Sequence, residues 1–195
     1  MLPDFPEDHQ SASQISDAVV AAMSQHDPAA CAEVYRRYVK QIYHYALARV
    51  NNVSDAQDLT SQTFIAALEC ISRYRGQNQF TAWLFGIAHH KVTDYFRRRA
   101  PESLDAAAHL AAATPLPDEA AERKLQLEQV IEVLTTLSPD RAEAVALRVF
   151  GGLCPAEASQ IMNRDQAAVT MLVYRGLRDL RQRVSIPQEE IEDAQ

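Results

Sequence analysis

The chain has 195 residues, a length that suits one medium-sized domain or two small ones. Five glycines are too few for a turn-rich β fold, and no apolar run approaches the ~20 residues that span a bilayer, so we expect no membrane insertion. The acidic N-terminus does not resemble a secretory signal. Three separated cysteines, Cys31, Cys70 and Cys154, indicate the reducing cytoplasm.

The net charge of −7 hides an uneven distribution. Residues 29–99 hold ten Lys or Arg against five acids, and residues 137–184 hold seven against five. Residues 1–28, 100–136 and 185–195 are acidic. Positive charge is therefore confined to two blocks, and the local field of those blocks decides where a polyanion such as nucleic acid can dock.

The chain opens with predicted helices. Residues 17–23 form a short one, and Asp27 with Pro28 is typical of a helix cap followed by a first-turn proline. From residue 29 to about 50, apolar residues recur every three or four positions, which predicts a long amphipathic helix. After a break, we expect Ser54 or Asp55 to cap a third helix, with Asp55 and Asp58 in its first turn.

Residues 80–99 have helical spacing, beginning apolar and aromatic and ending in three arginines. Aromatics beside a cationic helix end suit a nucleic-acid surface, because charges meet phosphates while rings stack on unpaired bases. Equally, solvated arginines at a helix end complement the helix dipole. Trp83 and Phe85 are expected in the core, as aromatics at helical spacing usually are.

Residues 100–121 are rich in proline, alanine and acids, which predicts a flexible linker. Apolar residues from Leu125 to Leu137 then predict another helix. Three more helices are expected, from 141 to 150, from 155 to 162 and from 166 to about 184. The chain is thus predicted to be all-α, with two small helical domains joined by the linker. The last two helices and their polar turn have the outline of a helix-turn-helix, although a plain helical hairpin fits the same periodicity.

Three blocks together resemble a bacterial sigma factor of the extracytoplasmic-function type. Residues 55–64 resemble the family's core-polymerase-binding motif, and residues 80–99 its promoter-melting and minus-10-reading segment. Residues 137–141, followed by Glu157 and the last helix, resemble its minus-35 helix-turn-helix. The resemblance implies a factor without catalytic activity or cofactor, whose partners are core RNA polymerase, promoter DNA and an anti-sigma factor.

The resemblance also assigns site residues. Those expected to bind core polymerase are Asp55, Gln57, Asp58, Ser61 and Gln62. Those expected at minus-10 DNA are Gly76, Gln77, Asn78, Gln79, Phe80, His90, Lys91, Arg97, Arg98 and Arg99. Those expected at minus-35 DNA are Arg164, Gln166, Thr170, Tyr174, Arg175 and Arg178. Departures from the family pattern at His89-His90 and Thr170-Met171 leave the promoter preference open.

The implied organisation is an N-terminal extension (1–28), sigma region 2 (29–99), a linker (100–121), sigma region 4 (122–184) and an acidic tail (185–195). A stand-alone helix-turn-helix regulator is the alternative, but it gives residues 55–64 and 80–99 no role. A metal-dependent enzyme is disfavoured, because adjacent histidines such as His89 and His90 diverge by about 100° on a helix and cannot easily share an ion.

Overall fold

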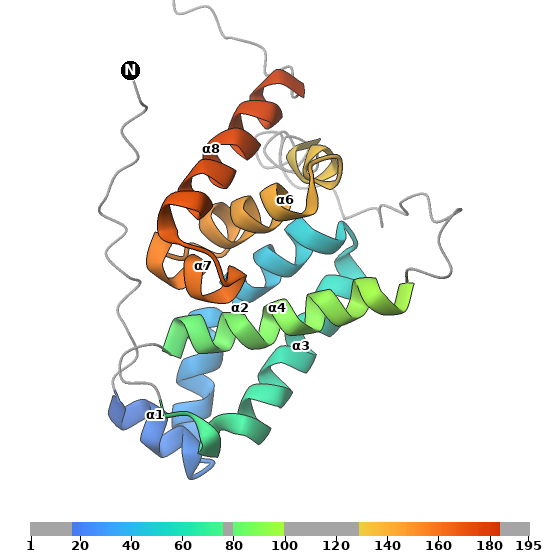
Figure 1. The fold of residues 1–195 in the computed structure, drawn as a ribbon. Coiled ribbons are helices and arrows are strands. Elements are labelled where there is room, and N and C mark those ends of the chain that lie inside the picture. The colour runs from blue at the N-terminus through green and yellow to red at the C-terminus, as the bar shows by residue number, and fades with distance from the viewer. Residues whose placement is uncertain (1–16, 76–79, 100–128, 184–195) are drawn as a thin grey trace, which may run out of the picture.

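The computed structural model describes residues 17–75, 80–99 and 129–183, and every regular element in these ranges is helical (Figure 1). This confirms the prediction of an all-α chain. The predicted linker at 100–121 and the acidic tail lie outside the described residues. No helix in the described ranges is long and apolar enough to cross a membrane.

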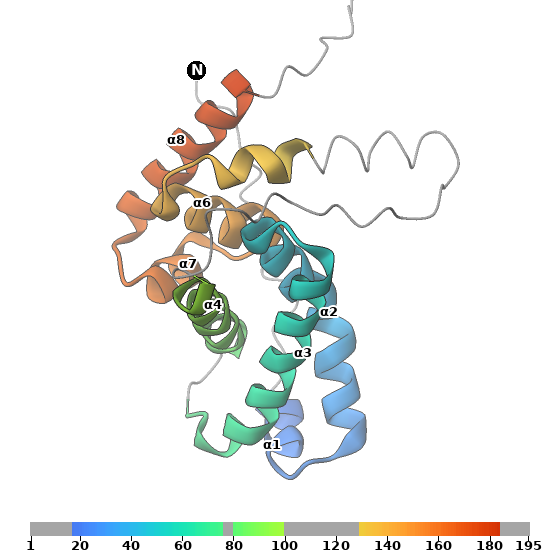
Figure 2. The same cartoon turned by 90° about the vertical axis from the view of Figure 1, so that its right-hand side faces the viewer.

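The N-terminal unit is built around three long helices. Its elements are α1 (Asp17–Ser24), α2 (Pro28–Val50), α3 (Val53–Cys70), the 3-10 turn η1 (Ile71–Arg73) and α4 (Phe80–Arg99). The views in Figures 1 and 2 show α2 and α3 running side by side with α4 lying across them. Each helix buries one flank in a common core, as the apolar spacing predicted.

Helix caps explain where these elements begin and end. The Asp27 side chain accepts a hydrogen bond from the Ala29 N–H at 2.8 Å, and Pro28 occupies the first turn, as predicted. Asp55 lies in the first turn of α3, as predicted, but the predicted cap was wrong. Asn52, rather than Ser54 or Asp55, is the cap, because its side chain accepts from the Asp55 N–H at 3.0 Å. Asp58 consequently lies beyond the first turn.

The C-terminal unit begins in a helical segment at 129–135 and continues through four elements. They are α6 (Pro139–Val145), the π-helical turn η2 (Ala146–Phe150), α7 (Pro155–Met162) and α8 (Gln166–Arg183). The single helix expected at 141–150 therefore starts two residues earlier and changes its hydrogen-bonding period halfway. Helix α8 packs against both α6 and α7, so α7 and α8 belong to a larger helical unit rather than to an isolated hairpin.

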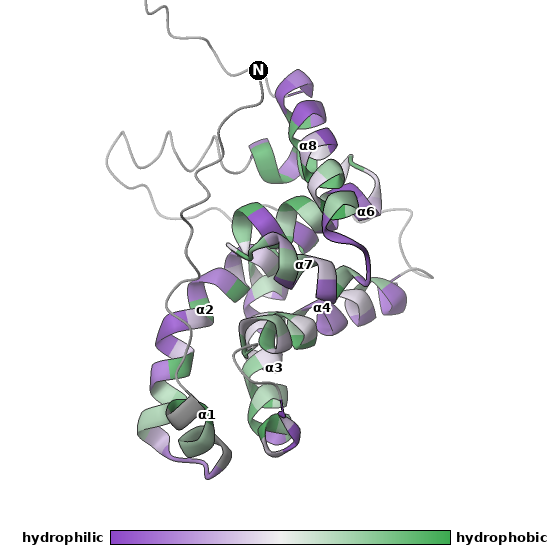
Figure 3. Ribbon diagram, turned by 60° about the vertical axis from the view of Figure 1, so that its left-hand side comes forward, coloured by the Kyte–Doolittle hydropathy of each residue, from purple (hydrophilic) through white to green (hydrophobic). Residues whose placement is uncertain are grey.

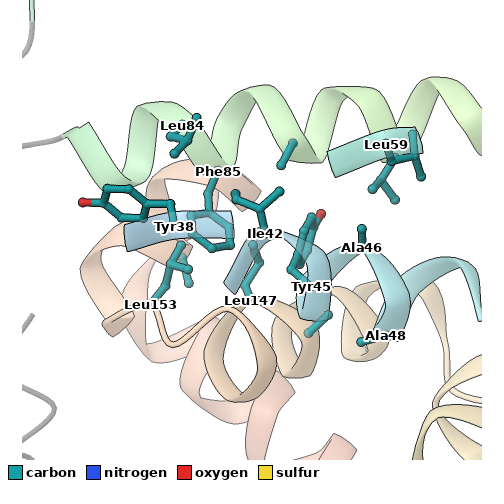
Figure 4. Packing of buried hydrophobic residues seen from close by; sticks show 14 of the residues in the cluster. Tyr38, Ile42, Tyr45, Ala46, Ala48, Leu59, Leu84, Phe85, Leu147 and Leu153 are labelled. Atoms are coloured by element: carbon teal, nitrogen blue, oxygen red, sulfur yellow. The ribbon is translucent and has the colours of Figure 1, made fainter. Parts of the chain in front are cut away.

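The two units share one hydrophobic core, which the sequence patterns did not predict. Tyr38, Ile42 and Tyr45 of α2 and Phe85 of α4 meet Leu147 and Leu153 of the C-terminal unit (Figure 4). All six side chains are at most 1% exposed. Full burial of a large apolar side chain contributes ~1.5–3 kcal/mol, so this contact contributes substantially to holding the units together.

Two helical glycines give a matched test of packing. A β-carbon on Gly176 would lie 2.6 Å from Cγ2 of the buried Val145, whereas one on Gly86 would meet nothing within 4 Å. We expect Gly176→Ala to lower the free energy of unfolding by about 1–2 kcal/mol, because overpacking outweighs the better helix propensity of alanine. Gly86→Ala should raise it by about 0.5–1 kcal/mol. Urea unfolding of both variants checks this, and shifts of the same sign would contradict it.

Candidate nucleic-acid interface

The residues expected to bind core polymerase lie mainly on the exposed surface of α3. Gln57, Asp58, Ser61 and Gln62 are exposed, and the Ser61 hydroxyl donates to the Gln57 carbonyl at 3.0 Å. Asp55 differs from them, because it is half-buried and already occupied. Its Oδ2 accepts from the Tyr95 hydroxyl at 2.6 Å and from Arg99 Nη1 at 2.8 Å. Asp55 therefore ties the start of α3 to the end of α4.

The basic side chains at the end of α4 differ in whether an acidic side chain pairs with them. Arg97 Nη2 lies 2.9 Å from Asp94 Oδ1, and Arg99 is held by Asp55 over the Tyr95 ring. Arg98 is exposed and has no ion-pair partner among the described residues. His90 is also exposed, with Nδ1 3.4 Å from Asp94 Oδ2, and Lys91 is half-buried. Of the three arginines at the end of α4, Arg98 is thus the one whose charge has no ion-pair partner among the described residues.

The start of α4 is aromatic and mostly buried. Phe80 is 4% exposed and contacts the rings of Tyr38, Tyr74 and Trp83, so in this arrangement its ring is not free to stack on a base. Phe85 lies in the core as predicted, but Trp83 is only half-buried. Gly76, Gln77, Asn78 and Gln79, the predicted base-capturing loop, lie outside the described residues.

Trp83 opens onto a crevice of about 390 Å³ between the two units. Helix α4 contributes Trp83, Gly86 and His89, and α7 of the other unit contributes Gln160 and Ile161. Arg73, the last residue of η1, and Arg75 also line the crevice. One flank of α4 therefore faces the C-terminal unit across this crevice, while the flank that bears His90 stays exposed.

The predicted minus-35 residues lie on the outer side of the C-terminal unit. Gln166, Thr170 and Tyr174 are four apart on α8 and all exposed, as are Arg175 and Arg178. Figure 3 shows hydrophilic bands along this helix. Arg164 in the turn is exposed but pairs with Asp140 Oδ2 at 2.6 Å. The Asp165 side chain accepts from the Ala168 N–H at 2.7 Å, which fixes the start of α8.

A buried polar cluster joins the two units, and no motif predicted it. Glu143 of α6 is 6% exposed, and all three of its partners come from the N-terminal unit. The Tyr45 hydroxyl of α2 donates to Oε1 at 2.7 Å, and His89 Nδ1 of α4 lies 2.8 Å from the same oxygen. Arg49 Nε of α2 forms an ion pair with Oε2 at 2.8 Å. These four side chains are called the Glu143 cluster below.

The Glu143 carboxylate is ionised within this cluster. Burial raises the pKa of Glu143, but the hydrogen bond from His89, the positive charge of Arg49 and the Tyr45 hydroxyl together lower it below its ordinary value. Because an ionised carboxylate only accepts, His89 carries its proton on Nδ1. Burial and the neighbouring Glu143 charge raise the pKa of Tyr45 well above its usual value, so Tyr45 remains a donor.

The signal for Glu143 was present but could not be interpreted from sequence. Glu143 stands in the run Ala142-Glu143-Ala144-Val145, where its neighbours are small and apolar. A charged residue in such a run indicates a buried site with a partner, but the partner residues lie more than fifty positions away in the sequence.

Among the described residues, no group of three His, Cys, Asp or Glu side chains could hold a metal ion.

Comparison with known families matches both units. The family described as "Sigma-70 region 2" matches residues 34–102, and that described as "Sigma-70, region 4" matches residues 127–180. The extracytoplasmic-function (ECF) RNA polymerase sigma factor BldN of Streptomyces coelicolor is 32% identical over 155 residues, covering 75% of this chain and 57% of that protein. The chain thus spans little more than half the length of that relative.

Other relatives are matched over most of their length. The RNA polymerase sigma factor YlaC of Bacillus subtilis is 25% identical over 162 residues, covering 81% of this chain and 94% of that protein. Among solved structures, CnrH in complex with the cytosolic domain of CnrY superposes with a TM-score of 0.66 at 20% identity, over 84% of this chain and 92% of that one. The sigma factor RpoE bound to the anti-sigma factor NepR, from Bartonella quintana, gives 0.63 at 20% identity, over 80% and 97%.

The lowered pKa of Glu143 predicts how the cluster depends on pH. A carboxyl whose pKa is depressed by folding stabilises the fold above its ordinary pKa and loses this effect as the pH falls through the folded value. Glu143→Gln should lower the free energy of unfolding at neutral pH by about 3 kcal/mol, because it leaves Arg49 without its counter-charge. The difference from wild type should shrink as the solution is acidified below the ordinary pKa of a glutamate.

Urea unfolding across a pH series measures this difference. Asp140→Asn is the control, since it removes the same charge from an exposed ion pair and should cost at most about 1 kcal/mol. A Glu143→Gln deficit that stays constant, or grows, at low pH would show that the ionised carboxylate is not the stabilising form.

Proposed function

This chain belongs to the sigma-70 family of RNA polymerase sigma factors, in its ECF group, and on that premise we propose that it binds core RNA polymerase in the cytoplasm and directs it to promoters. The observation that carries the proposal is the match of region 2 and region 4, in that order, on two helical units. A stand-alone regulator would leave region 2 without a role. The factor itself catalyses nothing, since the polymerase performs the chemistry.

The exposed row on α3 is the surface that we assign to core polymerase. Asp58 gives it a negative charge without a partner among the described residues, and Gln57, Ser61 and Gln62 add hydrogen-bonding groups. Each exposed ion pair contributes ~0.2–1 kcal/mol, so several contacts must act together. Asp55 has a different role in this proposal, because its bonds to Tyr95 and Arg99 orient α3 against α4 rather than reach outward.

We assign the two DNA surfaces to α4 and α8. The loop at 76–79, the exposed flank with His90 and the arginines at the end of α4 would contact the minus-10 element. The row Gln166, Thr170 and Tyr174 would enter the major groove at the minus-35 element, with Arg175 and Arg178 towards the phosphates. In this proposal the units are residues 29–99 and 122–184.

An anti-sigma factor is a further proposed partner. RpoE, which shares the fold at 20% identity, was solved with the anti-sigma factor NepR. The exposed row on α3 and the crevice between the units are surfaces that such a partner could cover.

Run-off transcription with purified core polymerase on a library of promoters tests the function. We expect start sites that appear only when the chain is present, and co-elution of the chain with core enzyme. A chain that binds promoter DNA alone, and neither co-elutes with core nor supports initiation, would instead favour the stand-alone regulator.

Arg98 tests the assignment of phosphate contacts on α4. Because its charge is uncompensated within the described residues, we expect Arg98→Ala to weaken promoter binding by the holoenzyme and to reduce the slope of log K against log salt by about 0.9, the value for one phosphate contact on duplex DNA. Arg36→Ala, which removes an exposed arginine from α2, is the matched control and should leave the slope unchanged. Equal slopes for the Arg98 variant and wild type would contradict the assignment.

A further inference from the structure

We propose that the Glu143 cluster is a built-in latch, which holds the two units closed over one flank of α4 when no partner is bound. The inference concerns a contact within this chain. Its regulatory consequence rests on the proposed function, but the latch itself can be measured without polymerase or DNA.

The first step of the argument is that the cluster joins the units specifically. Among the described residues, the side-chain partners of Glu143 all lie across the interface, in α2 and α4. A shift that keeps the interface packed but moves Glu143 away would leave the Arg49 charge and the Tyr45 hydroxyl, both now largely buried, without that partner. Because a buried charge that loses its partner is strongly unfavourable, the contact favours one packed position of the units over other packed positions.

The second step is that the apolar contact around the cluster fits closely. A β-carbon on Gly151 would lie 2.8 Å from the Phe85 ring of α4 and 2.9 Å from Leu153. The next residue, Gly152, adopts a φ of 71° and faces the side chain of Gln41 in α2. The turn after η2 therefore approaches the N-terminal unit with glycines at both points of contact, which is typical of a formed interface.

The third step is that closure is incompatible with the proposed promoter contacts. Elements named minus-10 and minus-35 lie about 25 base pairs apart, or about 85 Å at 3.4 Å per base pair. In the structure α4 and α7 pack against each other, and α7 faces the flank that carries Trp83, Gly86 and His89. The units must therefore separate to read both elements at once, and separation breaks the Glu143 cluster.

The latch can be measured with the chain's own fluorophore. Trp83 is the only tryptophan, and it lines the crevice together with Gln160 and Ile161 of the C-terminal unit. Opening should expose the indole, which raises its quenching by acrylamide and shifts its emission to longer wavelength. Small-angle scattering of the full-length chain reports the same opening as an increase in the radius of gyration.

Two variants break the latch from opposite sides. Glu143→Gln removes the carboxylate from α6, and His89→Gln removes a half-exposed partner from α4. Each should raise the open-to-closed ratio at least tenfold, with greater Trp83 quenching and a larger radius of gyration. Asp179→Asn is the control, since it removes a charge whose pair with Arg141 lies within the C-terminal unit. It should change neither reading, and far-UV circular dichroism should show full helicity in all three variants.

The consequence for function is measured with core polymerase. We expect Glu143→Gln to associate with core enzyme faster than wild type. Failure of the wild-type chain to bind core would contradict the proposed function and not the latch, which the tryptophan reading tests alone. The latch is overturned if quenching and radius of gyration are the same for wild type, Glu143→Gln and His89→Gln. It is overturned equally if Asp179→Asn opens the chain to the same extent.

Discussion

The structure depends on a single carboxylate placed where two helical units meet. Moving an ion out of water costs several kcal/mol, so a buried Glu143 is tolerated only with close compensation. That compensation comes entirely from the other unit, through Tyr45, Arg49 and His89. The packing of Phe85 against Leu147 and Leu153 surrounds the cluster with apolar side chains. Hydrophobic contact supplies most of the attraction, and the cluster selects the relative position.

Helix α4 links this interface to the proposed DNA surface, because one flank is buried in the N-terminal core, a second faces the crevice and a third is exposed. Leu84, Ala88 and Val92 are buried in the N-terminal core. Trp83, Gly86 and His89 face the crevice, and His90 belongs to the exposed flank. His89 and His90 are neighbours in sequence, yet a turn of about 100° sends one into the Glu143 cluster and the other to the surface. Under the proposed function, a substitution in α4 would thus act on stability, closure or DNA binding according to its flank.

Local features were predictable from the sequence, and contacts between distant segments were not. Apolar spacing gave the positions of α2, α4 and α8 because side-chain burial follows the helical period directly. Asp27 with Pro28 correctly predicted a cap. Asn52 was missed in favour of Ser54 or Asp55, because all three are capping residue types and only the backbone path decides which side chain reaches the Asp55 N–H. The proposed site residues came from the family resemblance, because no fold principle selects them. Glu143 stayed unnoticed because its partners lie between 54 and 98 positions away, and pairing over such separations leaves no periodic signal.

A closed form changes how affinity for the polymerase should be understood. If core enzyme binds only the open form, its apparent affinity falls by the fraction of chain that is open. An open fraction of about one per cent would weaken binding about a hundredfold, or by about 2.7 kcal/mol. Each member of the Glu143 cluster can alter this fraction without touching polymerase or DNA. Under the proposed function, residues on α3 and residues at the interface between the units would therefore influence the same measured affinity through different equilibria. The fluorescence of Trp83, which reports closure alone, would distinguish the two effects.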